Sequence, residues 1–379
     1  MKPVVIAAYV RSPFTFANKG ALVKTRPDDL AAQVVRALMV RTGVAPDSIE
    51  DLILGCAFPE GEQGFNIGRL VGFLADLPLS VSGMTVNRFC GSSMQAIHIA
   101  AGAIQMNAGA AFICAGVESM SRIPMTGFNP MPHPGLAERY PQAYMSMGET
   151  AENVAAKWDI GRDAQDRFAV ESHRKAAAAQ EGGLLRDEIV SITTPGGARV
   201  EADGCIRPGT DMEGLSTLKP AFDQNGVVTA GTASPLTDGA TAVLVCSAEY
   251  AEKYGLEPLA YVRGIATSGC APEIMGIGPV ESSRKALARA GIEVGDVDVV
   301  ELNEAFSSQS IASIRELGLD AAKVNLDGGA LALGHPLGAT GARITGKAAA
   351  LLGRTGGRWA LATQCIGGGQ GIATVMERV

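Results

Sequence analysis

The chain is poor in aromatic and charged side chains. Phe, Trp and Tyr make up 5% of its 379 residues, and Asp, Glu, Lys and Arg make up 19%. So few aromatic residues leave few large anchors for a peptide partner, and so few charges argue against a disordered chain. Gly and Ala are abundant instead, which suits helices packed closely on sheets. The composition therefore predicts a well-packed globular protein of two or three domains.

The sequence also lacks a basic excess and long runs of like charge. Its formal net charge is -7, which argues against nucleic acid as a partner because neutralising phosphates needs a basic face. A local basic spot for a small phosphorylated ligand remains compatible with this charge. The apolar run at residues 4–10 is too short for a signal peptide core or a membrane span. We expect a first strand there, with no export and no membrane insertion.

Patterns for metal ligands and disulfides are absent as well. The seven cysteines include no C-x-x-C pair, and the four histidines show no ligand spacing. A structural zinc site is therefore not expected. An odd number of scattered cysteines forms no paired framework, so we expect the chain to work reduced in a cytoplasmic compartment.

What the sequence does contain is an internal resemblance. In residues 37–54, and again in residues 286–300, a helical pattern leads through a short acidic turn to a buried strand. A motif typical of a functional site follows each, around Cys90 in the first half and His335 in the second. An internal duplication of one α/β unit is the simplest account. Apolar strands alternating with helices indicate buried sheets covered on both faces.

A different region separates the two halves. It begins with a Met-, Pro- and Gly-rich stretch, continues with a polar helical pattern at residues 149–180 interrupted near Gly161, and ends in a strand-like run at residues 227–230. Such an insert is typical of a lid or binding arm. We therefore predict an N-terminal α/β half, an inserted loop domain and a C-terminal α/β half, at residues 1–119 (completed by about 237–257), 120–236 and 258–379.

The most informative segment, residues 87–96, places Cys90 between a strand-like run and a small-residue helical pattern that ends at Gln105. A cysteine at a helix N-terminus lies at the positive end of the helix dipole, beside unpaired N–H groups. That place lowers the pKa of a thiol and favours the nucleophilic thiolate. The same N–H groups could hold an oxyanion. The alternative interpretation is a small buried side chain.

Two further motifs are polar residues in apolar surroundings. Asn303 and Glu304 follow a buried strand, the place where α/β sheets position ligands, although Asn303 could equally cap a helix. His335 lies in the glycine-rich bend at residues 328–338, where glycines allow close backbone approach and Pro336 fixes the turn. A histidine in that context favours a functional role.

A second cysteine, Cys365, ends an apolar strand and precedes a glycine run at residues 367–371. A dinucleotide-binding loop should open a helix, but residues 372–376 have the pattern of a strand. The N–H groups of these glycines could instead form an oxyanion hole.

Together, these four motifs resemble the thiolase family. The likeness covers essentially the whole chain, including residues 147–153 and 230–234. It implies duplicated α/β domains in five layers, α-β-α-β-α, with an inserted loop domain that binds coenzyme A. It also implies an acyltransferase that cleaves 3-ketoacyl-CoA with coenzyme A, or runs the reverse Claisen condensation. Acyl-CoA and coenzyme A would be its only small-molecule partners, with no metal and no separate cofactor.

The resemblance also implies a role for each site residue. Cys90 is the nucleophile that becomes acylated, His335 activates it, and Cys365 acts as acid and base. Such chemistry needs one group that holds the acyl chain and another that moves a proton at the α-carbon. It also needs two oxyanion holes, because two thioester carbonyls develop negative charge at different steps.

By the same resemblance, Asn303 holds a water that shares one oxyanion hole with His335. The backbone N–H groups of Cys90 and Gly367 form the other hole. The residues that match positions near the coenzyme A moiety are Arg207 and Ser234.

Subtype and assembly follow from finer features. Ser146 stands where short-chain biosynthetic members often carry histidine, and residues 91–96 are more similar to degradative members. We therefore favour fatty-acid β-oxidation, with an acetoacetyl-CoA-forming biosynthetic thiolase as the alternative. The family resemblance implies a homodimer or homotetramer, and some degradative members join a hydratase–dehydrogenase subunit.

Two other functions remain as alternatives. A condensing enzyme acting on acyl-carrier protein would need a second histidine beside its cysteine and would leave Cys365 without a task. A non-catalytic lipid-CoA carrier or scaffold subunit would not need Cys90, His335 and Cys365, and all three are present.

Overall fold

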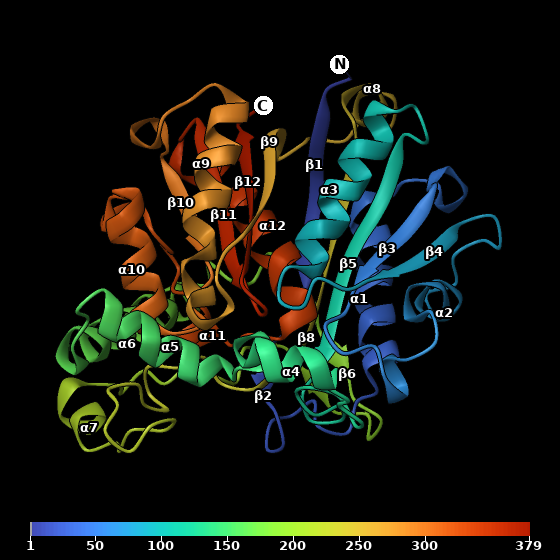
Figure 1. Cartoon of the computed structure of the whole chain (residues 1–379). Coiled ribbons are helices and arrows are strands. Elements are labelled where there is room, and N and C mark those ends of the chain that lie inside the picture. The colour runs from blue at the N-terminus through green and yellow to red at the C-terminus, as the bar shows by residue number, and fades with distance from the viewer. Residues whose placement is uncertain (1) are drawn as a thin grey trace.

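The structure, a computed structural model that describes residues 2–379, is a mixed α/β protein built on a ten-stranded sheet (Figure 1). The strands of the N-terminal half are β1 (Val4–Arg11), β2 (Thr15–Phe16), β3 (Asp51–Gly55), β4 (Ser82–Val86), β5 (Ala111–Ser119) and β8 (Thr237–Ser247). Those of the C-terminal half are β9 (Ala260–Gly269), β10 (Val299–Leu302), β11 (Trp359–Ile366) and β12 (Gln370–Glu377). Two short strands of the insert, β6 (Ile192–Thr193) and β7 (Arg199–Val200), pair with each other.

The helices alternate with these strands along the chain. They are α1 (Pro27–Thr42), α2 (Ile67–Leu74), α3 (Ser92–Gln105), α4 (Pro134–Arg139), α5 (Met147–Lys157), α6 (Arg162–Glu181), α7 (Met212–Ser216), α8 (Ala248–Lys253), α9 (Gly278–Ala290), α10 (Ser307–Leu317), α11 (Ala330–Leu333) and α12 (Leu337–Thr355). Short 3-10 helices span Pro46–Ser48, Gly61–Gln63, Pro141–Tyr144, Pro272–Ile277, Val294–Asp296 and Ala321–Lys323.

The two halves repeat one strand pattern. In the N-terminal half, β5 runs parallel to β3 and antiparallel to β8, which is antiparallel to β1. In the C-terminal half, β11 runs parallel to β10 and antiparallel to β12, which is antiparallel to β9. A short pairing between β1 and β9 joins the two sets into one sheet. The repeated order agrees with the predicted duplication of an α/β unit.

Helices cover both faces of each half and form a shared central layer. In the N-terminal half, α1 and α2 pack on the outer face, and in the C-terminal half α9 packs on β9 and β12 beside α10. Between the halves, α3 and α12 pack against each other and against strands of both halves. Figure 1 shows the resulting order of helix, strand, helix, strand and helix layers. The predicted five-layer α/β fold is therefore confirmed.

The central helices approach unusually closely. A Cβ added at Gly341 of α12 would lie 2.8 Å from the Cβ of Met94 in α3, and nearer still to the Met94 backbone nitrogen. Likewise, a Cβ added at Gly116 of β5 would lie 2.6 Å from the Cβ of Ser93. These contacts fix the first turns of α12 against the first turn of α3. The residues just before each helix are thereby brought together.

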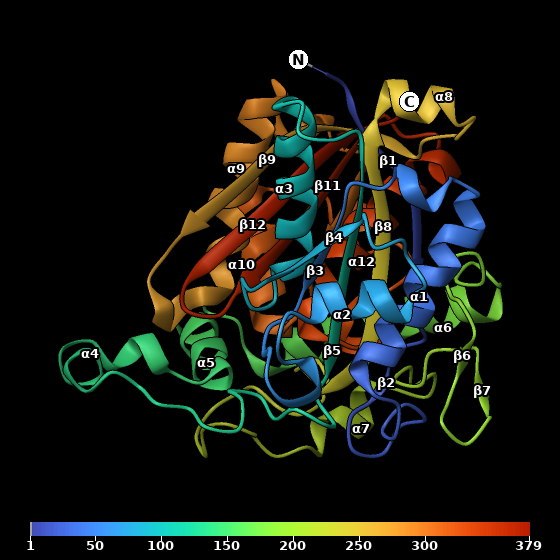
Figure 2. The same ribbon diagram turned by 90° about the vertical axis from the view of Figure 1, so that its right-hand side faces the viewer.

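The inserted segment lies across one end of both halves. Its helices α5 and α6 run along the lower edge in Figure 1, and α4 projects from the body of the molecule in Figure 2. The polar helical pattern at residues 149–180 forms two helices, α5 and α6, with the break at residues 158–161. Ser146 caps α5, because its hydroxyl accepts from the Glu149 N–H and the Glu149 carboxylate accepts from the Ser146 N–H.

One strand expectation in this segment is wrong. Residues 227–230 form no regular strand. Instead, the N–H groups of Val227 and Val228 each donate to the carboxylate of Glu152 on α5, at 2.9 Å. A side chain thus supplies the acceptors that a neighbouring strand would otherwise provide. Residues 240–246, for which the sequence left strand or helix open, belong to strand β8.

Within residues 2–379, no helix combines the length and the apolar character that a membrane crossing requires.

The close approach of α3 and α12 predicts a sharp difference between two glycines of the same helix. Gly341→Ala should destabilise the fold by about 1–3 kcal/mol, because the new methyl group meets the α3 backbone. Gly353→Ala is the matched control: a Cβ there meets nothing within 4 Å, so it should be neutral or stabilise α12 by up to about 1 kcal/mol. Melting temperatures measured by calorimetry compare them. Equal melting temperatures would contradict the packing described.

Candidate active site

The predicted site residues lie on loops that leave one end of the two halves. Cys90 follows β4, Asn303 follows β10 and Gly367 follows β11, while His335 precedes α12. Contacts bring these loops together across the halves. The side-chain amide of Gln364 donates to the Cys90 carbonyl oxygen, and a Cβ on Gly91 would meet the Ile366 side chain. The tight packing of α3 on α12 thus places the Cys90 motif of the N-terminal half beside the motifs of the C-terminal half.

A strained turn presents Cys90. Phe89, just before it, has a φ of 43°, which is rare for a residue with a bulky side chain. The hydroxyl of Ser92 holds this turn: it accepts from the Arg88 N–H at 2.9 Å and donates to the Phe89 carbonyl at 2.6 Å. Gly91 then caps α3. The backbone therefore passes from strand to helix within a few residues, with the thiol at the bend.

The expected thiolate at Cys90 does not form in the resting protein. Burial raises the pKa of the Cys90 thiol to about 11, although the N–H of Gly367 and the N–H of Cys90 itself lower it. The cost of burying a negative charge outweighs the stabilisation that a helix N-terminus provides. At neutral pH the resting thiol is therefore protonated, and an acceptor must take its proton before it can attack as a thiolate. Both N–H groups lie within hydrogen-bond reach of the sulfur, and their role as an oxyanion hole stays a prediction.

The second thiol, Cys365, lies beside the first. Burial raises its pKa well above the ordinary value, and the neighbouring Cys90 raises it further. Its side chain packs with Ala151 and Phe306, next to Met147. Burial thus disfavours the thiolate form of both cysteines in the resting protein. The two thiols, one from each half, lie close enough to interact electrostatically.

The His335 ring is held at both nitrogens. Nδ1 lies 2.7 Å from the Thr340 hydroxyl, which itself donates to the Pro336 carbonyl at 2.9 Å. The Thr340 oxygen therefore accepts from Nδ1–H, which leaves a lone pair on Nε2. The Asn303 side-chain nitrogen lies 3.3 Å from Nε2. Burial and the charge of Arg343 lower the pKa of His335 to about 3, so the ring is neutral.

Asn303 is not a helix cap. The following helix, α10, begins at Ser307 and its N-cap is Phe306. Asn303 is fully buried beside His335 instead, and its Oδ1 atom has no protein partner among residues 2–379. The pairing of Asn303 with His335 was foreseen through the family resemblance, whereas the partner of Nδ1, Thr340, was missed. The sequence signal that could have predicted this partner is a threonine in the first turn of the helix that follows His335.

Two buried glutamates support the loops: Glu304, which was noted from the sequence together with Asn303, and Glu118, which was missed. The Glu118 carboxylate, at the end of β5, accepts from the N–H groups of Ala57 and Gly338, at 2.8 and 2.9 Å. Glu304, next to Asn303, accepts from the Ser172 hydroxyl at 2.6 Å and the Asn325 amide at 2.7 Å. Burial raises the pKa of each carboxyl, and these donors counteract the rise. A glutamate at the end of an apolar strand was the available signal.

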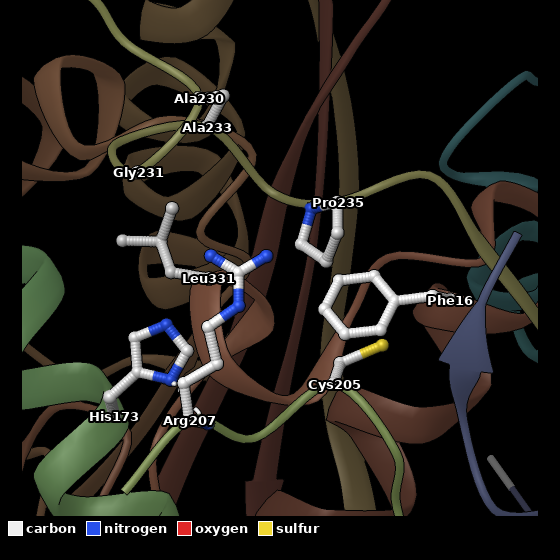
Figure 3. Close-up of a pocket in the computed structure, with 9 residues that line it drawn as sticks. All are labelled: Phe16, His173, Cys205, Arg207, Ala230, Gly231, Ala233, Pro235 and Leu331. Carbon is white, nitrogen blue, oxygen red and sulfur yellow. Dashed lines mark hydrogen bonds between the residues drawn. The ribbon is translucent and has the colours of Figure 1, made fainter. Parts of the chain in front are cut away.

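Arg207 and Ser234 lie on neighbouring loops at the edge of the site. The Ser234 N–H donates to the Ala305 carbonyl at 2.9 Å, which joins its loop to the segment after β10. The exposed Arg207 guanidinium lies over the Phe16 ring, 5.1 Å from its centroid, and the Arg207 N–H donates to His173 Nδ1. Arg207 and both sequence neighbours of Ser234 border a small cavity (Figure 3), lined by Phe16, His173, Cys205, Arg207, Ala230, Gly231, Ala233, Pro235 and Leu331.

Two features of the described part of the chain concern metal binding and the redox state of the cysteines. Residues 2–379 contain no group of three or more His, Cys, Asp or Glu side chains arranged to hold a metal ion. All seven cysteines are free thiols, and five of them are buried.

Comparison with known proteins matches this arrangement to one family. The thiolase N-terminal domain model matches residues 4–249, and the thiolase C-terminal domain model matches residues 256–378. A 3-ketoacyl-CoA thiolase from Bacillus subtilis (strain 168) is 46% identical over 389 aligned residues, and one from Aeromonas salmonicida (strain A449) is 48% identical over 388. In both cases the match covers 100% of this chain and 100% of the relative. The chain therefore belongs to the thiolase family of acyltransferases.

Proposed function

We propose that this protein cleaves 3-ketoacyl-CoA with coenzyme A into acetyl-CoA and a shortened acyl-CoA, and that it can run the reverse Claisen condensation. The observation that carries the proposal is the pair of adjacent thiols, half-buried Cys90 and fully buried Cys365, with the Gly367 N–H within hydrogen-bond reach of the Cys90 sulfur. The full-length similarity to proteins named 3-ketoacyl-CoA thiolase supports the substrate class.

The first half-reaction forms the acyl-enzyme. The Nε2 lone pair of His335 takes the Cys90 proton as the sulfur attacks the 3-keto carbon, and a carbon–sulfur bond forms. The bond between the α-carbon and the 3-keto carbon then breaks, and acetyl-CoA leaves as an enolate. Cys365 donates its proton to that α-carbon and becomes a thiolate. A neutral imidazole and a protonated Cys365 are the forms that this sequence requires at its start.

The second half-reaction releases the product. The Cys365 thiolate takes the proton of an incoming coenzyme A thiol, whose sulfur attacks the acyl group on Cys90. The Cys90 sulfur leaves and recovers its proton from His335. All three side chains thereby return to their resting protonation states, so the cycle needs no external acid, base or cofactor.

Two sets of donors stabilise the oxyanions. The N–H groups of Cys90 and Gly367 donate to the oxygen on the carbon that is bonded to the Cys90 sulfur. After it has accepted the thiol proton, His335 presents Nε2–H, and a water on Asn303 completes the second set. The unpaired Oδ1 atom of Asn303 supports this assignment, because it can accept from that water. Donors aimed at developing charge in a dry site are the largest single source of rate enhancement in many enzymes.

Degradative chemistry, assembly and compartment belong to the same proposal. We place the enzyme in fatty-acid β-oxidation. An activity assay with 3-ketoacyl-CoA substrates of increasing chain length would contradict this if only acetoacetyl-CoA were cleaved.

We expect a homodimer or homotetramer that uses the edge strand β4, since exposed apolar side chains gather around it at Phe65, Phe73, Leu79 and Met84. Light scattering that gives a monomer would contradict that. Free thiols support a reducing, cytoplasmic compartment, which cell fractionation tests.

Acylation of Cys90 tests the proposed function directly. Incubation with acetyl-CoA should add an acetyl group to the peptide that contains Cys90, as read by mass spectrometry. Cys90→Ala should lower the rate of thiolysis by a factor of about 1000 or more, as for nucleophiles in other enzymes. Acetylation of another residue with Cys90 unmodified would refute the assignment. Cys114→Ala, at a buried thiol of β5 with no role proposed here, is the control and should retain activity.

Cys365→Ala should separate the two half-reactions. The variant should still accept an acetyl group from acetyl-CoA, because Cys90, His335 and the donor N–H groups remain. It should fail to exchange the α-protons of acetyl-CoA with deuterated water, since no base reaches that carbon. Nuclear magnetic resonance of the recovered acetyl-CoA measures the exchange. Exchange at the wild-type rate would show that Cys365 is only a packing residue.

Arg207→Ala should mainly raise KM for the CoA substrates. We propose that the inserted segment at residues 120–236 binds coenzyme A, and that Arg207 and Ser234 contact it. The chain is acidic overall, so a local cation must offset repulsion of the CoA phosphates. Loss of binding that is equal in ground and transition states raises KM and leaves kcat unchanged. Steady-state kinetics decide: an unchanged KM with a collapsed kcat would place Arg207 at the chemistry instead.

A further inference from the structure

A buried ion pair links the strand that carries Asn303 to the helix that carries His335. Arg343 of α12 donates from a terminal nitrogen to the Glu301 carboxylate of β10 at 2.6 Å, and the two side chains are 1% and 0% exposed. Glu301 precedes Asn303 by two residues, and the Asn303 N–H extends the pairing of β10 with β11 by donating to the Thr363 carbonyl at 3.0 Å. Both side chains therefore leave the same face of that segment. Arg343 follows Thr340 by three residues, which places them on one face of α12.

The bonding of this pair is sparse. The Nε atom and the second terminal nitrogen of Arg343, and one oxygen of Glu301, have no protein partner within the described part of the chain. By contrast, the guanidinium of buried Arg11 donates two hydrogen bonds of 2.7 Å to the Asp203 carboxylate and a third to the Glu188 carboxylate. A buried pair with unmatched groups is a weak source of stability, because desolvation offsets the attraction. Stability alone therefore does not account for this arrangement.

The charge of Arg343 acts on the His335 ring. Together with burial, it lowers the pKa of His335. The elements packed around the His335 loop carry other titratable groups, namely Cys90 before α3, Glu118 at the end of β5, Cys205 in the insert, Asp238 on β8, Glu301 on β10, Glu304 after β10 and Cys365 on β11. Burial raises the pKa of Glu301 to about 7, although the Arg343 cation lowers it. Burial raises the pKa of each of these groups, which favours their neutral forms. The guanidinium cannot lose its charge.

We propose that Arg343, held in place by Glu301, is a positioning residue that keeps the His335 ring neutral and seated between Thr340 and Asn303. It touches no reacting atom. Its cation opposes a second cation on the ring, and its bond to β10 sets the distance between the strand and helix that bring Asn303 and His335 together. This role rests on the proposed function, because a neutral Nε2 is what accepts the Cys90 proton.

The test reads the protonation of His335 without turnover. Four histidines are present, so ring carbon–proton signals of a histidine-labelled sample are few, and His335→Asn identifies the relevant one. In the wild type, the His335 signal should not titrate between about pH 8 and pH 5. In the neutral double variant Glu301→Gln/Arg343→Gln, its titration should begin at a higher pH. The signals of His98 and His173, which lie beside other arginines, should not move.

Kinetics and a conservative variant complete the experiment. The double variant should lose tenfold or more in kcat with little change in KM. The acid limb of its kcat–pH profile should shift to higher pH. Arg343→Lys keeps the charge, so it should restore the wild-type His335 titration and part of the activity. If the double variant fails to fold, the Lys variant decides alone: a His335 titration raised above the wild type overturns the proposal.

The outcomes separate this inference from the proposed function. An unchanged His335 titration in an active, folded double variant overturns the role of Arg343 and leaves the thiolase assignment intact. Absence of thiolysis in the wild type overturns the proposed function, while the titration still reports whether Arg343 keeps the ring neutral.

Discussion

The near contact between α3 and α12 is the constraint on which the rest of the structure depends. Each helix begins just after a residue of the candidate site, Cys90 in one half and His335 in the other. Their first turns meet where Gly341 leaves no room for a side chain against Met94. Because protein interiors transmit strain rather than absorb it, this packing converts the duplication of an α/β unit into one composite site. Neither half contains the full set of residues alone.

Burial then decides the chemical state of that site. A thiol and an imidazole in a dry interior are both favoured in their neutral forms, and the pKa of Cys90 near 11 and that of His335 near 3 follow from this. A resting ion pair between thiolate and imidazolium is therefore absent. In the proposed mechanism, charge develops only when a substrate carbonyl lies beside the N–H groups of Cys90 and Gly367. The folded protein therefore avoids the desolvation cost of burying separated charges at this site before the substrate binds.

Buried carboxylates and cations fix the loops that carry the reacting groups. Glu118 joins the end of β5 to the start of α12, and Glu304 joins the segment after β10 to the insert and to α11. Each carboxylate accepts several N–H or O–H groups, so it acts as a hub for backbone that has no neighbouring strand. Loops that meet between the two halves have few neighbouring strands to accept their backbone N–H groups. Side-chain carboxylates act as the acceptors here instead.

Much of the fold could be predicted from the sequence, because its signals are local. Apolar runs and small-residue helical patterns indicated β1, β3, β11 and β12, the pair α5 and α6, and the repeat that relates the halves. The motifs around Cys90, Asn303, His335 and Cys365 carry the family resemblance by themselves. Where a distant side chain intervened, the prediction was wrong: the strand expected at residues 227–230 gave way to the carboxylate of Glu152.

By itself, then, the sequence determined the fold class and the family and predicted which side chains react, since these inferences depend on residue order and local periodicity. Only the tertiary structure decided their protonation states and partners. The helix N-terminus at Cys90 suggested a thiolate, but desolvation by both halves reversed the sign of that shift. The hydrogen bond of His335 to Thr340 and the effect of the Arg343 charge on the His335 pKa follow from the burial of α12 between the two sets of strands. Electrostatic energy depends on distance and solvent exposure in three dimensions, and no linear motif records either quantity.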